Sequence, residues 1–287
     1  MQPHIAIIGA GVIGASIARH LAPNARVTVL EATLPAAEAS SKGFGWINAS
    51  FTETPAYFRL RLEAIAAHHR LEAQIRPIAQ WGGALWWEDQ GAAFDHHHQT
   101  MTAQGYPLTL LTRDQITALE PNLANPPDRC LLAPLEGAAD GPALTQALLN
   151  HPNITLRLGS PVTGLTRTAN RVTGIETTNG PLAADAVLIA AGAASPTLLK
   201  PLGLHLTIDQ IPGLILHTRP TTPQVSHLIL ADDVHFRQDR TGRIIAGEKF
   251  YGGGPNADRI VTAPDALAVE VMDHLRARLP NADLQLE

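Results

Sequence analysis

Residues 4–31 constrain the fold more than any other stretch of the chain. An apolar run rich in β-branched residues, 5–8, predicts a buried parallel strand. A glycine-rich turn, 9–14, follows at once, and helical spacing of apolar residues comes after it. A second apolar run, 26–30, predicts another strand and is followed by an acid, Glu31. We therefore expect a strand, a turn, a helix and a strand, closed by a carboxylate.

Each glycine of the turn has a physical role in such a unit. Gly9 permits the tight turn, and Gly11 has no Cβ, so that a pyrophosphate can approach the backbone. Gly14 allows the helix and the strand to pack closely. Glu31 can accept hydrogen bonds from adenosine ribose hydroxyls. The pattern therefore predicts a dinucleotide site of the Rossmann type.

The expected helix begins within the glycine turn. Ile13, Ile17 and Leu21 recur at helical spacing and predict one apolar face. The free N–H groups and the positive end of the helix dipole would face the phosphates. The alternative is a glycine-rich turn in an ordinary α/β unit. Glu31 disfavours NADP, because it would repel the 2′-phosphate, but it does not separate NAD from FAD.

Length and composition bound the class of protein. The chain has 287 residues, enough for one large or two ordinary domains. A net charge of −5 gives no basic surface for nucleic acid. No stretch approaches the roughly twenty apolar residues of a membrane span, and the first apolar run is explained by a strand. Cys130 is the only cysteine and is expected to be a buried structural thiol. We expect a soluble, cytoplasmic protein.

No metal site is expected. His96, His97 and His98 are consecutive, and neighbouring residues of a helix point in different directions. A solvated helix face is the better interpretation of this run.

A second informative stretch is 40–49. It combines Ser40, Ser41 and Lys42 with two glycines, a composition that suits contact with a phosphate or a ribityl chain. The alternative is a surface loop. Phe44 and Trp46 argue against that alternative, because large aromatic residues are unusual in a purely solvated loop.

Together, residues 5–31 and 39–49 resemble the D-amino-acid oxidase superfamily of FAD-dependent oxidoreductases, and in particular its glycine oxidase and D-amino-acid dehydrogenase branch. The resemblance implies that Ser40 and Ser41 lie along the FAD diphosphate and ribityl chain. It also implies that Gly45 and Trp46 lie near the flavin ring. The residues expected to bind FAD in these two stretches are Gly9, Gly11, Ile13, Gly14, Glu31, Ser40, Ser41, Gly45 and Trp46.

The run 185–192 is continuously apolar and ends on small residues, which predicts a strand buried on both faces. Small residues there allow a dinucleotide to lie across the strand end. The element is typical of two-dinucleotide-type flavoproteins and favours FAD over NAD. By resemblance, the backbone of Val162 pairs with the adenine, and Ala191 and Gly192 border the FAD.

The predicted fold class is α/β, a Rossmann-like FAD-binding domain of the two-dinucleotide type with a substrate domain built on a mixed or antiparallel sheet. The FAD-binding domain is expected over 1–80 and 138–205, and the substrate domain over 81–137 and 206–287. A glycine-rich loop is expected over 251–258.

Two residues of the substrate domain are candidates for substrate binding. His235 and Arg237 lie two apart on a predicted strand and so share a face. In similar proteins the matching hairpin faces the active site, where Arg237 could clamp a substrate carboxylate. The alternative is an arginine on a surface hairpin. No acid–base pair is apparent, so the catalytic residues are unknown.

The expected function is oxidation of the C–N bond of an amino acid or related amine by hydride transfer to FAD. The family pattern continues after the equivalent of Glu287 with a further segment, so we expect this chain to lack the usual C-terminal segment and its substrate domain to be incomplete at the C-terminal end. A partner chain could therefore supply it, and the alternative is an inactive flavin-binding fragment or one subunit of a hetero-oligomeric dehydrogenase. A simple NAD dehydrogenase is a third interpretation.

Overall fold

The computed structural model describes residues 2–50, 52, 54–209, 213–247 and 264–287. Contacts divide the chain into a first unit, Met1–Gly43 with Asp140–Gln210, and a second unit, Phe44–Ala139 with Ile211–Glu287. The expected glycine-rich loop at 251–258 lies outside the described residues.

The boundary between the units differs from the expected one. Residues 44–80 were expected in the cofactor domain, but they belong to the second unit. The reason is a small sheet in which β3 (Trp46–Ile47) and β4 (Ala79–Gln80) both pair with β8 (Gly137–Ala139). These pairings join segments that are far apart in the sequence. The assignment of one unit to the cofactor and the other to the substrate stays a prediction.

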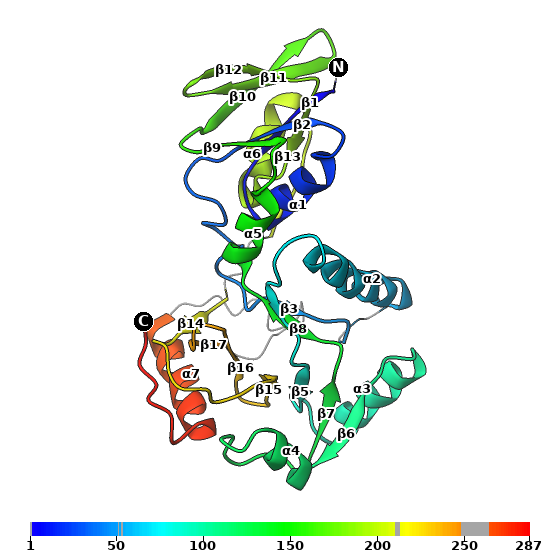
Figure 1. The fold of residues 1–287 in the computed structure, drawn as a ribbon, viewed down its shortest axis with the longest axis vertical. Helices are drawn as coiled ribbons and strands as arrows, with labels where there is room; N and C mark the ends of the chain where they lie inside the picture. The colour runs from blue at the N-terminus through cyan, green and yellow to red at the C-terminus, as the bar shows by residue number, and fades with distance from the viewer. Residues whose placement is uncertain (1, 51, 53, 210–212, 248–263) are drawn as a thin grey trace. The chain divides into compact units, whose positions relative to one another are not determined.

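The first unit is built on a four-stranded parallel sheet, which confirms the expected strand, turn, helix and strand (Figure 1). The two central strands are apolar: Ala6, Ile7, Val27 and Val29 are fully buried. Their burial explains the continuous apolar runs. In sheet order the strands are β13 (Ala186–Ile189), β1 (His4–Ile8), β2 (Arg26–Leu30) and β9 (Ile154–Arg157).

Helix α1 (Val12–Leu21) packs beside α5 (Gly141–Leu149) in this unit (Figure 1). The expected apolar face of α1 is found only in part, because Ile17 and Leu21 are partly buried but Ile13 is not. Ile13 is 66% exposed, and the residues that α1 buries are small: Gly14, Ala15 and Ala18. Small residues face inward because neighbouring backbone approaches this helix closely, as the contacts of Gly14 show below.

The remaining elements of the first unit include a β-meander. Its three strands form an antiparallel sheet that packs on the parallel one through an apolar cluster around Ile8, Leu30 and Ile175. The elements are β10 (Val162–Thr168), β11 (Arg171–Thr177), β12 (Gly180–Ala183), η1 (Gly192–Ala194), α6 (Ser195–Leu199) and η2 (Lys200–Leu202).

The second unit is built on a seven-stranded mixed sheet, in which β15 and β5 form a parallel pair and the other pairs are antiparallel. In sheet order the strands are β14 (Ile215–His217), β17 (Ile244–Gly247), β16 (His235–Gln238), β15 (Leu228–Leu230), β5 (Ala84–Trp86), β7 (Arg129–Ala133) and β6 (Thr109–Thr112). Helices α2 (Pro55–Glu72), α3 (Gly91–Ala103), α4 (Arg113–Leu119) and α7 (Pro264–Arg278) belong to the same unit.

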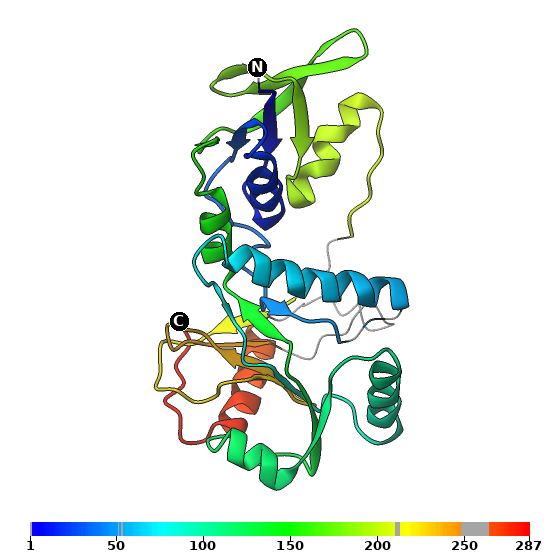
Figure 2. The same ribbon diagram turned by 45° about the vertical axis from the view of Figure 1, so that its right-hand side comes forward.

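Helix α7 covers one face of the seven-stranded sheet (Figure 2). Its Val271 and Leu275 belong to the same buried cluster as Phe236 of β16. Because side chains alternate along a strand, His235 and Arg237 project from the opposite face of the sheet. The two expected substrate residues therefore lie on the face of the sheet that α7 does not cover.

His97 differs from expectation. Its ring lies 4.4 Å from that of Trp86, so it packs on the core instead of standing in solvent. Burial lowers the pKa of His97 to about 4. Cys130 is fully buried, as expected, and burial raises its pKa to about 12.

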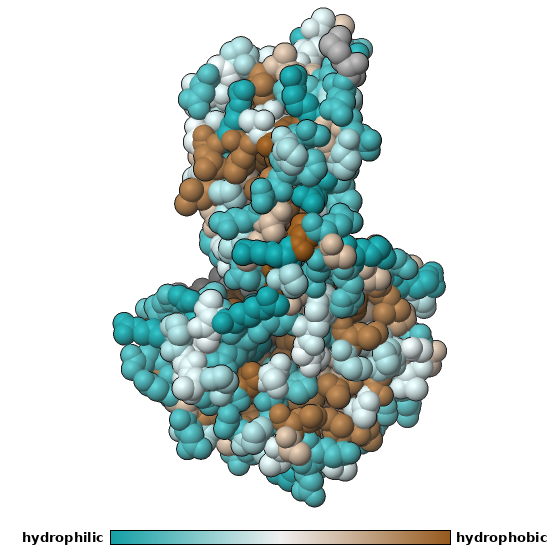
Figure 3. Space-filling model, in the orientation of Figure 1, coloured by the Kyte–Doolittle hydropathy of each residue, from teal (hydrophilic) through white to brown (hydrophobic). Residues whose placement is uncertain are grey.

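The described part of the chain contains no helix both long and apolar enough to span a membrane. On the face drawn in Figure 3, apolar surface is divided into separate areas by polar side chains. Within the residues that the structure describes, no group of three or more His, Cys, Asp or Glu residues is arranged to hold a metal ion.

Candidate cofactor and substrate site

The glycine turn lies against the end of β13. Gly9 has a φ of +103°, and a Cβ there would collide with the carbonyl oxygen of Ala190 and lie 3.1 Å from the Cα of Ala191. A Cβ on Gly14 would collide with the carbonyl oxygen of Gly9. The fold itself therefore requires both glycines. It also brings the glycine turn next to the small residues after β13, and the sequence analysis assigned both regions to the same cofactor.

Gly11 has a different environment. A Cβ there would meet, among the described residues, only the Oγ of Ser40, at 3.2 Å. That hydroxyl accepts a hydrogen bond of 2.9 Å from the backbone N–H of Val12, the first residue of α1. The start of α1 thus presents a donor to an oxygen atom, as a phosphate site requires, and backbone without a Cβ lies beside it. This arrangement fits a pyrophosphate.

Ser41, by contrast, is partly buried, and its Oγ donates a 3.0 Å hydrogen bond to the carbonyl oxygen of Glu38 in its own turn. Its expected contact with the cofactor stays a prediction.

Glu31 holds the turn, and its expected contact with a ribose stays a prediction. One carboxylate oxygen accepts a 2.9 Å hydrogen bond from the N–H of Ala10, and the other accepts one of 2.9 Å from the N–H of Thr33. Ala10 is fully buried, so its N–H depends on this partner. Glu31 therefore stabilises the local fold, a role that the sequence pattern did not reveal.

Gly141 is a residue whose role sequence reasoning missed. A Cβ at this position would collide with the carbonyl oxygen of Ser40, so the start of α5 can approach the 40–41 segment only with glycine there. Asp140 caps the same helix, because its Oδ1 accepts a 2.6 Å hydrogen bond from the N–H of Ala143. The glycine between Asp140 and Pro142 is thus required by the close approach of the Ser40 backbone.

The other expected cofactor residues of the first unit lie around its apolar cluster. Val162 and Ala191 are partly buried and pack against it. Gly192 has a φ of +52°, and none of the described atoms lies within 4 Å of where its Cβ would be. Ile13 is exposed on the first turn of α1. Their cofactor contacts stay predictions.

Gly45 and Trp46 lie in the second unit, at its small sheet. Gly45 has a φ of +76°, and a Cβ there would collide with the carbonyl oxygen of Ala139. The backbone N–H of Ala139 donates a 2.9 Å hydrogen bond to the carbonyl oxygen of Gly45. The Nε1 of Trp46 donates a 2.8 Å hydrogen bond to Glu136. Both residues are thus fixed by the 136–139 segment.

Glu136 is fully buried and was not singled out from the sequence. Besides the Trp46 indole, its carboxylate accepts hydrogen bonds from Ser50 and from the hydroxyl of Tyr106, at 2.6 and 2.9 Å for the two hydroxyls. Burial raises the pKa of Glu136, although these donors act in the opposite direction. The only signal in the sequence was an acid directly before Gly137 in apolar surroundings.

His235 and Arg237 lie on β16, next to the middle of the seven-stranded sheet, and Arg237 is only 4% exposed. Arg237 is therefore not on a surface hairpin. Its Nε donates a 2.7 Å hydrogen bond to the carbonyl oxygen of Phe44. His235 is fully buried, with its Nε2 at 3.3 Å from a carboxylate oxygen of Glu88. The carboxylate clamp stays a prediction.

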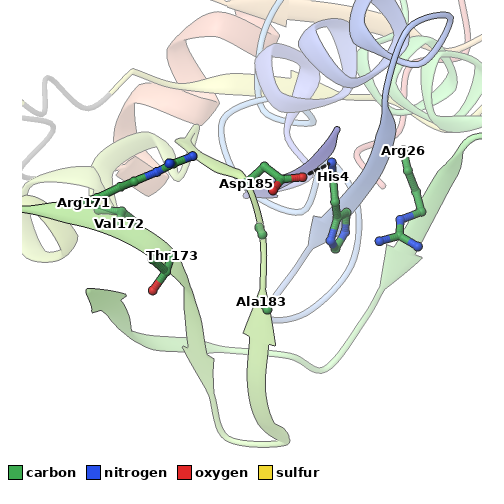
Figure 4. Close-up of a pocket in the computed structure, with 8 residues that line it drawn as sticks. His4, Arg26, Arg171, Val172, Thr173, Ala183 and Asp185 are labelled. Atoms are coloured by element: carbon green, nitrogen blue, oxygen red, sulfur yellow. Dashed lines mark hydrogen bonds between the residues drawn. The ribbon is translucent and has the colours of Figure 1, made fainter. Parts of the chain in front are cut away.

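A cavity of about 460 Å³ opens in the first unit at a different place (Figure 4). Its lining includes His4 and Arg26, the first residues of β1 and β2, together with Arg171 and Asp185. These residues lie at the amino ends of the parallel strands, whereas the glycine turn follows the carboxyl end of β1. Asp185 accepts a 2.8 Å hydrogen bond from the N–H of His4. The cavity is therefore separate from the candidate cofactor site.

The chain is similar to several known proteins. A family model described as FAD dependent oxidoreductase matches residues 4–287. A glycine oxidase of Pseudomonas aeruginosa is 28% identical over 302 residues, which cover 98% of this chain and 81% of that protein. A glycine oxidase of Pseudomonas putida is 34% identical over 137 residues, 46% of this chain but only 37% of that protein.

A D-amino acid dehydrogenase of Cereibacter sphaeroides is 36% identical over 121 residues, which span 40% of this chain and 28% of that protein. Among solved structures, glycine oxidase from Bacillus cereus superposes with a TM-score of 0.84 at 22% identity, covering 99% of this chain and 80% of that one. At that identity the likeness concerns the fold alone.

Proposed function

This chain belongs to the family of FAD-dependent oxidoreductases, and we propose that it binds FAD at the glycine turn of its first unit and oxidises the C–N bond of an amino acid or a related amine. Support for the substrate class comes from relatives named glycine oxidase and D-amino acid dehydrogenase. The alignment with the Pseudomonas putida glycine oxidase covers only 37% of that protein, so the activity itself is part of the proposal.

The observation that carries the proposal is the geometry at the start of α1. Backbone without a Cβ at Gly11 lies beside an N–H group that already donates to the oxygen of Ser40. The N–H groups at this end of the helix would donate hydrogen bonds to phosphate oxygens, and the helix dipole is positive there. Glu31 follows β2, and there its carboxylate would accept hydrogen bonds from the adenosine ribose hydroxyls.

When bound, FAD would accept a hydride from the α-carbon of the substrate, and the imine product would hydrolyse afterwards. The residues of this chain would bind and orient the reactants. Arg237 projects from the face of its sheet that α7 leaves uncovered and could pair with a substrate carboxylate. Its hydrogen bond to the Phe44 carbonyl uses Nε and would fix the direction of the guanidinium.

The test is an anaerobic assay on the whole chain. The purified protein is saturated with FAD, and glycine, sarcosine, D-alanine, L-proline and a carboxyl-free amine are added in turn. We expect the absorbance of oxidised flavin to fall with at least one of the carboxylate substrates. A protein that binds no FAD would contradict the proposal at its base.

The same assay separates the alternatives. Tight FAD binding with no bleaching by any compound would contradict the catalytic part and favour an inactive flavin-binding chain or a subunit that needs a partner. Gly11→Ala is the matched control, because it should lose both the bound flavin and the bleaching while the protein remains folded.

A further inference from the structure

The cavity of about 460 Å³ in the first unit lies at the amino ends of its parallel strands, away from the glycine turn (Figure 4). Small-molecule sites commonly have volumes of about 300–1,000 Å³, so this cavity is large enough for a small metabolite. Asp185, His4 and Arg26 line it from neighbouring positions across the parallel sheet. Arg171 and Thr173 line it from the start of β11. The whole lining therefore belongs to the first unit.

Hydrogen bonds fix the part of the lining that the parallel sheet provides. The Oδ2 of Asp185 accepts a 2.8 Å hydrogen bond from the N–H of His4, and the N–H of Asp185 donates one of 2.9 Å to the carbonyl oxygen of His4. The Nε2 of His4 lies 2.9 Å from the hydroxyl oxygen of buried Thr28. The Asp185 carboxylate and the His4 ring are thus held in place before any ligand binds, which lowers the entropic cost of binding.

Two cations flank these groups. Figure 4 shows Asp185 and His4 between Arg171 on one side and Arg26 on the other. No residue that the structure describes forms a hydrogen bond or an ion pair with either guanidinium group. The lining therefore carries two positive charges against the one negative charge of Asp185, and both guanidinium groups keep their N–H donors for another partner. Such a lining favours an anion that also has groups to donate to a carboxylate.

We propose that this cavity binds a phosphate monoester of a hydroxylated compound, such as a sugar phosphate. A phosphate monoester carries about −1.5 to −2 charges near pH 7, which matches two guanidinium groups better than a single carboxylate does. The carboxylate of Asp185 has acceptor capacity beyond the bond from His4, so it would accept hydrogen bonds from hydroxyl groups of the ligand. The cavity is larger than a phosphate group alone and leaves room for the organic part.

The proposed ligand binds at the opposite end of the sheet from the cofactor. In open α/β sheets, cofactors bind beyond the carboxyl ends of the strands, where the glycine turn follows β1. The cavity lies at the amino ends, so both sites can be occupied at the same time. Binding at the cavity therefore does not depend on the proposed oxidation.

The test is calorimetric titration of ribose 5-phosphate into the whole chain, at low salt and without phosphate in the buffer. We expect a Kd of about 1 mM or lower, a modest affinity, because the arginines are exposed and solvent weakens each contact. Inorganic phosphate should bind about three- to tenfold more weakly, because it lacks the hydroxyl groups of the sugar. Absence of binding by ribose 5-phosphate, or equally tight binding of ribose itself, would overturn the proposal.

Arg26→Gln and Arg171→Gln each remove one cation from the lining. Both side chains are exposed and have no partner among the described residues, so the variants should keep the wild-type melting temperature. Each should raise the Kd for ribose 5-phosphate about three- to tenfold.

Arg167 offers a matched control, because it is an exposed arginine on β10, opposite Val172 of β11, and does not line the cavity. Arg167→Gln should change the Kd by less than about twofold. An unchanged Kd in Arg26→Gln or in Arg171→Gln, or an equal rise in Arg167→Gln, would overturn the proposal.

Asp185→Asn separates the contact with the sugar from the contact with the phosphate. Its amide oxygen can still accept the N–H of His4, but the negative charge and an acceptor for hydroxyl groups are lost. Inorganic phosphate should therefore bind at least as tightly as to wild type. The preference for ribose 5-phosphate over inorganic phosphate should fall to less than about twofold. A preference as large as that of wild type would overturn the proposal.

Titration in the presence of saturating FAD distinguishes the cavity from the cofactor site. The Kd for ribose 5-phosphate should stay within about twofold of its value without FAD, because the two sites lie at opposite ends of the strands. Loss of binding on addition of FAD would place the phosphate at the glycine turn and overturn the proposal. A chain that binds ribose 5-phosphate at the cavity but binds no FAD would refute the proposed function and support this inference.

Discussion

Gly11→Ala should remove FAD binding and leave the fold in place. Gly11 has φ −71° and ψ 172°, a conformation that alanine adopts without strain. Its new Cβ would lie 3.2 Å from the Oγ of Ser40, a side-chain atom that can move by a few tenths of an ångström. We therefore expect the free energy of unfolding to change by less than about 1 kcal/mol.

The effect on binding should be much larger. The added methyl group lies where a pyrophosphate would approach the backbone, so phosphate oxygens would be held away from the first N–H groups of α1. Loss of two charge-assisted hydrogen bonds, each of about 1.5–3 kcal/mol, corresponds to a Kd about 10²- to 10⁴-fold higher.

The assay is titration of FAD into wild type and variant, followed by flavin fluorescence, with thermal unfolding measured on the same samples. Gly14→Ala is the contrasting variant: its Cβ would collide with the backbone carbonyl of Gly9, so the first unit itself should be destabilised. Binding of FAD by Gly11→Ala within threefold of wild type would refute the assignment of the phosphate site.

Three further predictions concern other residues. Glu31→Ala should raise the Kd for FAD about ten- to a hundredfold in a titration and also lower the melting temperature, because the N–H of buried Ala10 loses its acceptor; an unchanged melting temperature would contradict the structural role. Arg237→Lys should raise KM for carboxylate substrates and not for carboxyl-free amines, and equal effects on both would exclude the clamp. Because burial lowers the pKa of His97, the neutral imidazole contributes fully to stability above pH 6.5, and this contribution is lost as the pH falls toward 4. Between pH 7 and pH 5, the free energy of unfolding measured with urea should therefore fall by about 1–2 kcal/mol less in His97→Phe than in wild type.

The sequence was sufficient for features encoded by local patterns. The strand, turn, helix and strand over residues 4–31 follow from apolar runs and glycines that are close together in the chain. Glu31 was recognised for the same reason, because the acid directly follows a predicted strand. These features need no knowledge of distant contacts.

Features that depend on distant contacts could not be predicted. Glu136 contacts Trp46 from 90 residues away, and no local pattern marks either residue as a partner of the other. The unit boundary at Gly43 follows from pairing between β3 and β8. Ile13 was misassigned to the buried face of α1, because small residues such as Gly14 contact the neighbouring backbone there.

A crystal structure of the whole chain with FAD would measure directly where the pyrophosphate binds. We predict phosphate oxygens at hydrogen-bonding distance, about 2.7–3.2 Å, from N–H groups at the start of α1, and the adenosine ribose beside Glu31. A pyrophosphate bound elsewhere, such as at the cavity lined by Arg26 and Arg171 at the other end of the strands, would contradict the assignment of the glycine turn as the cofactor site.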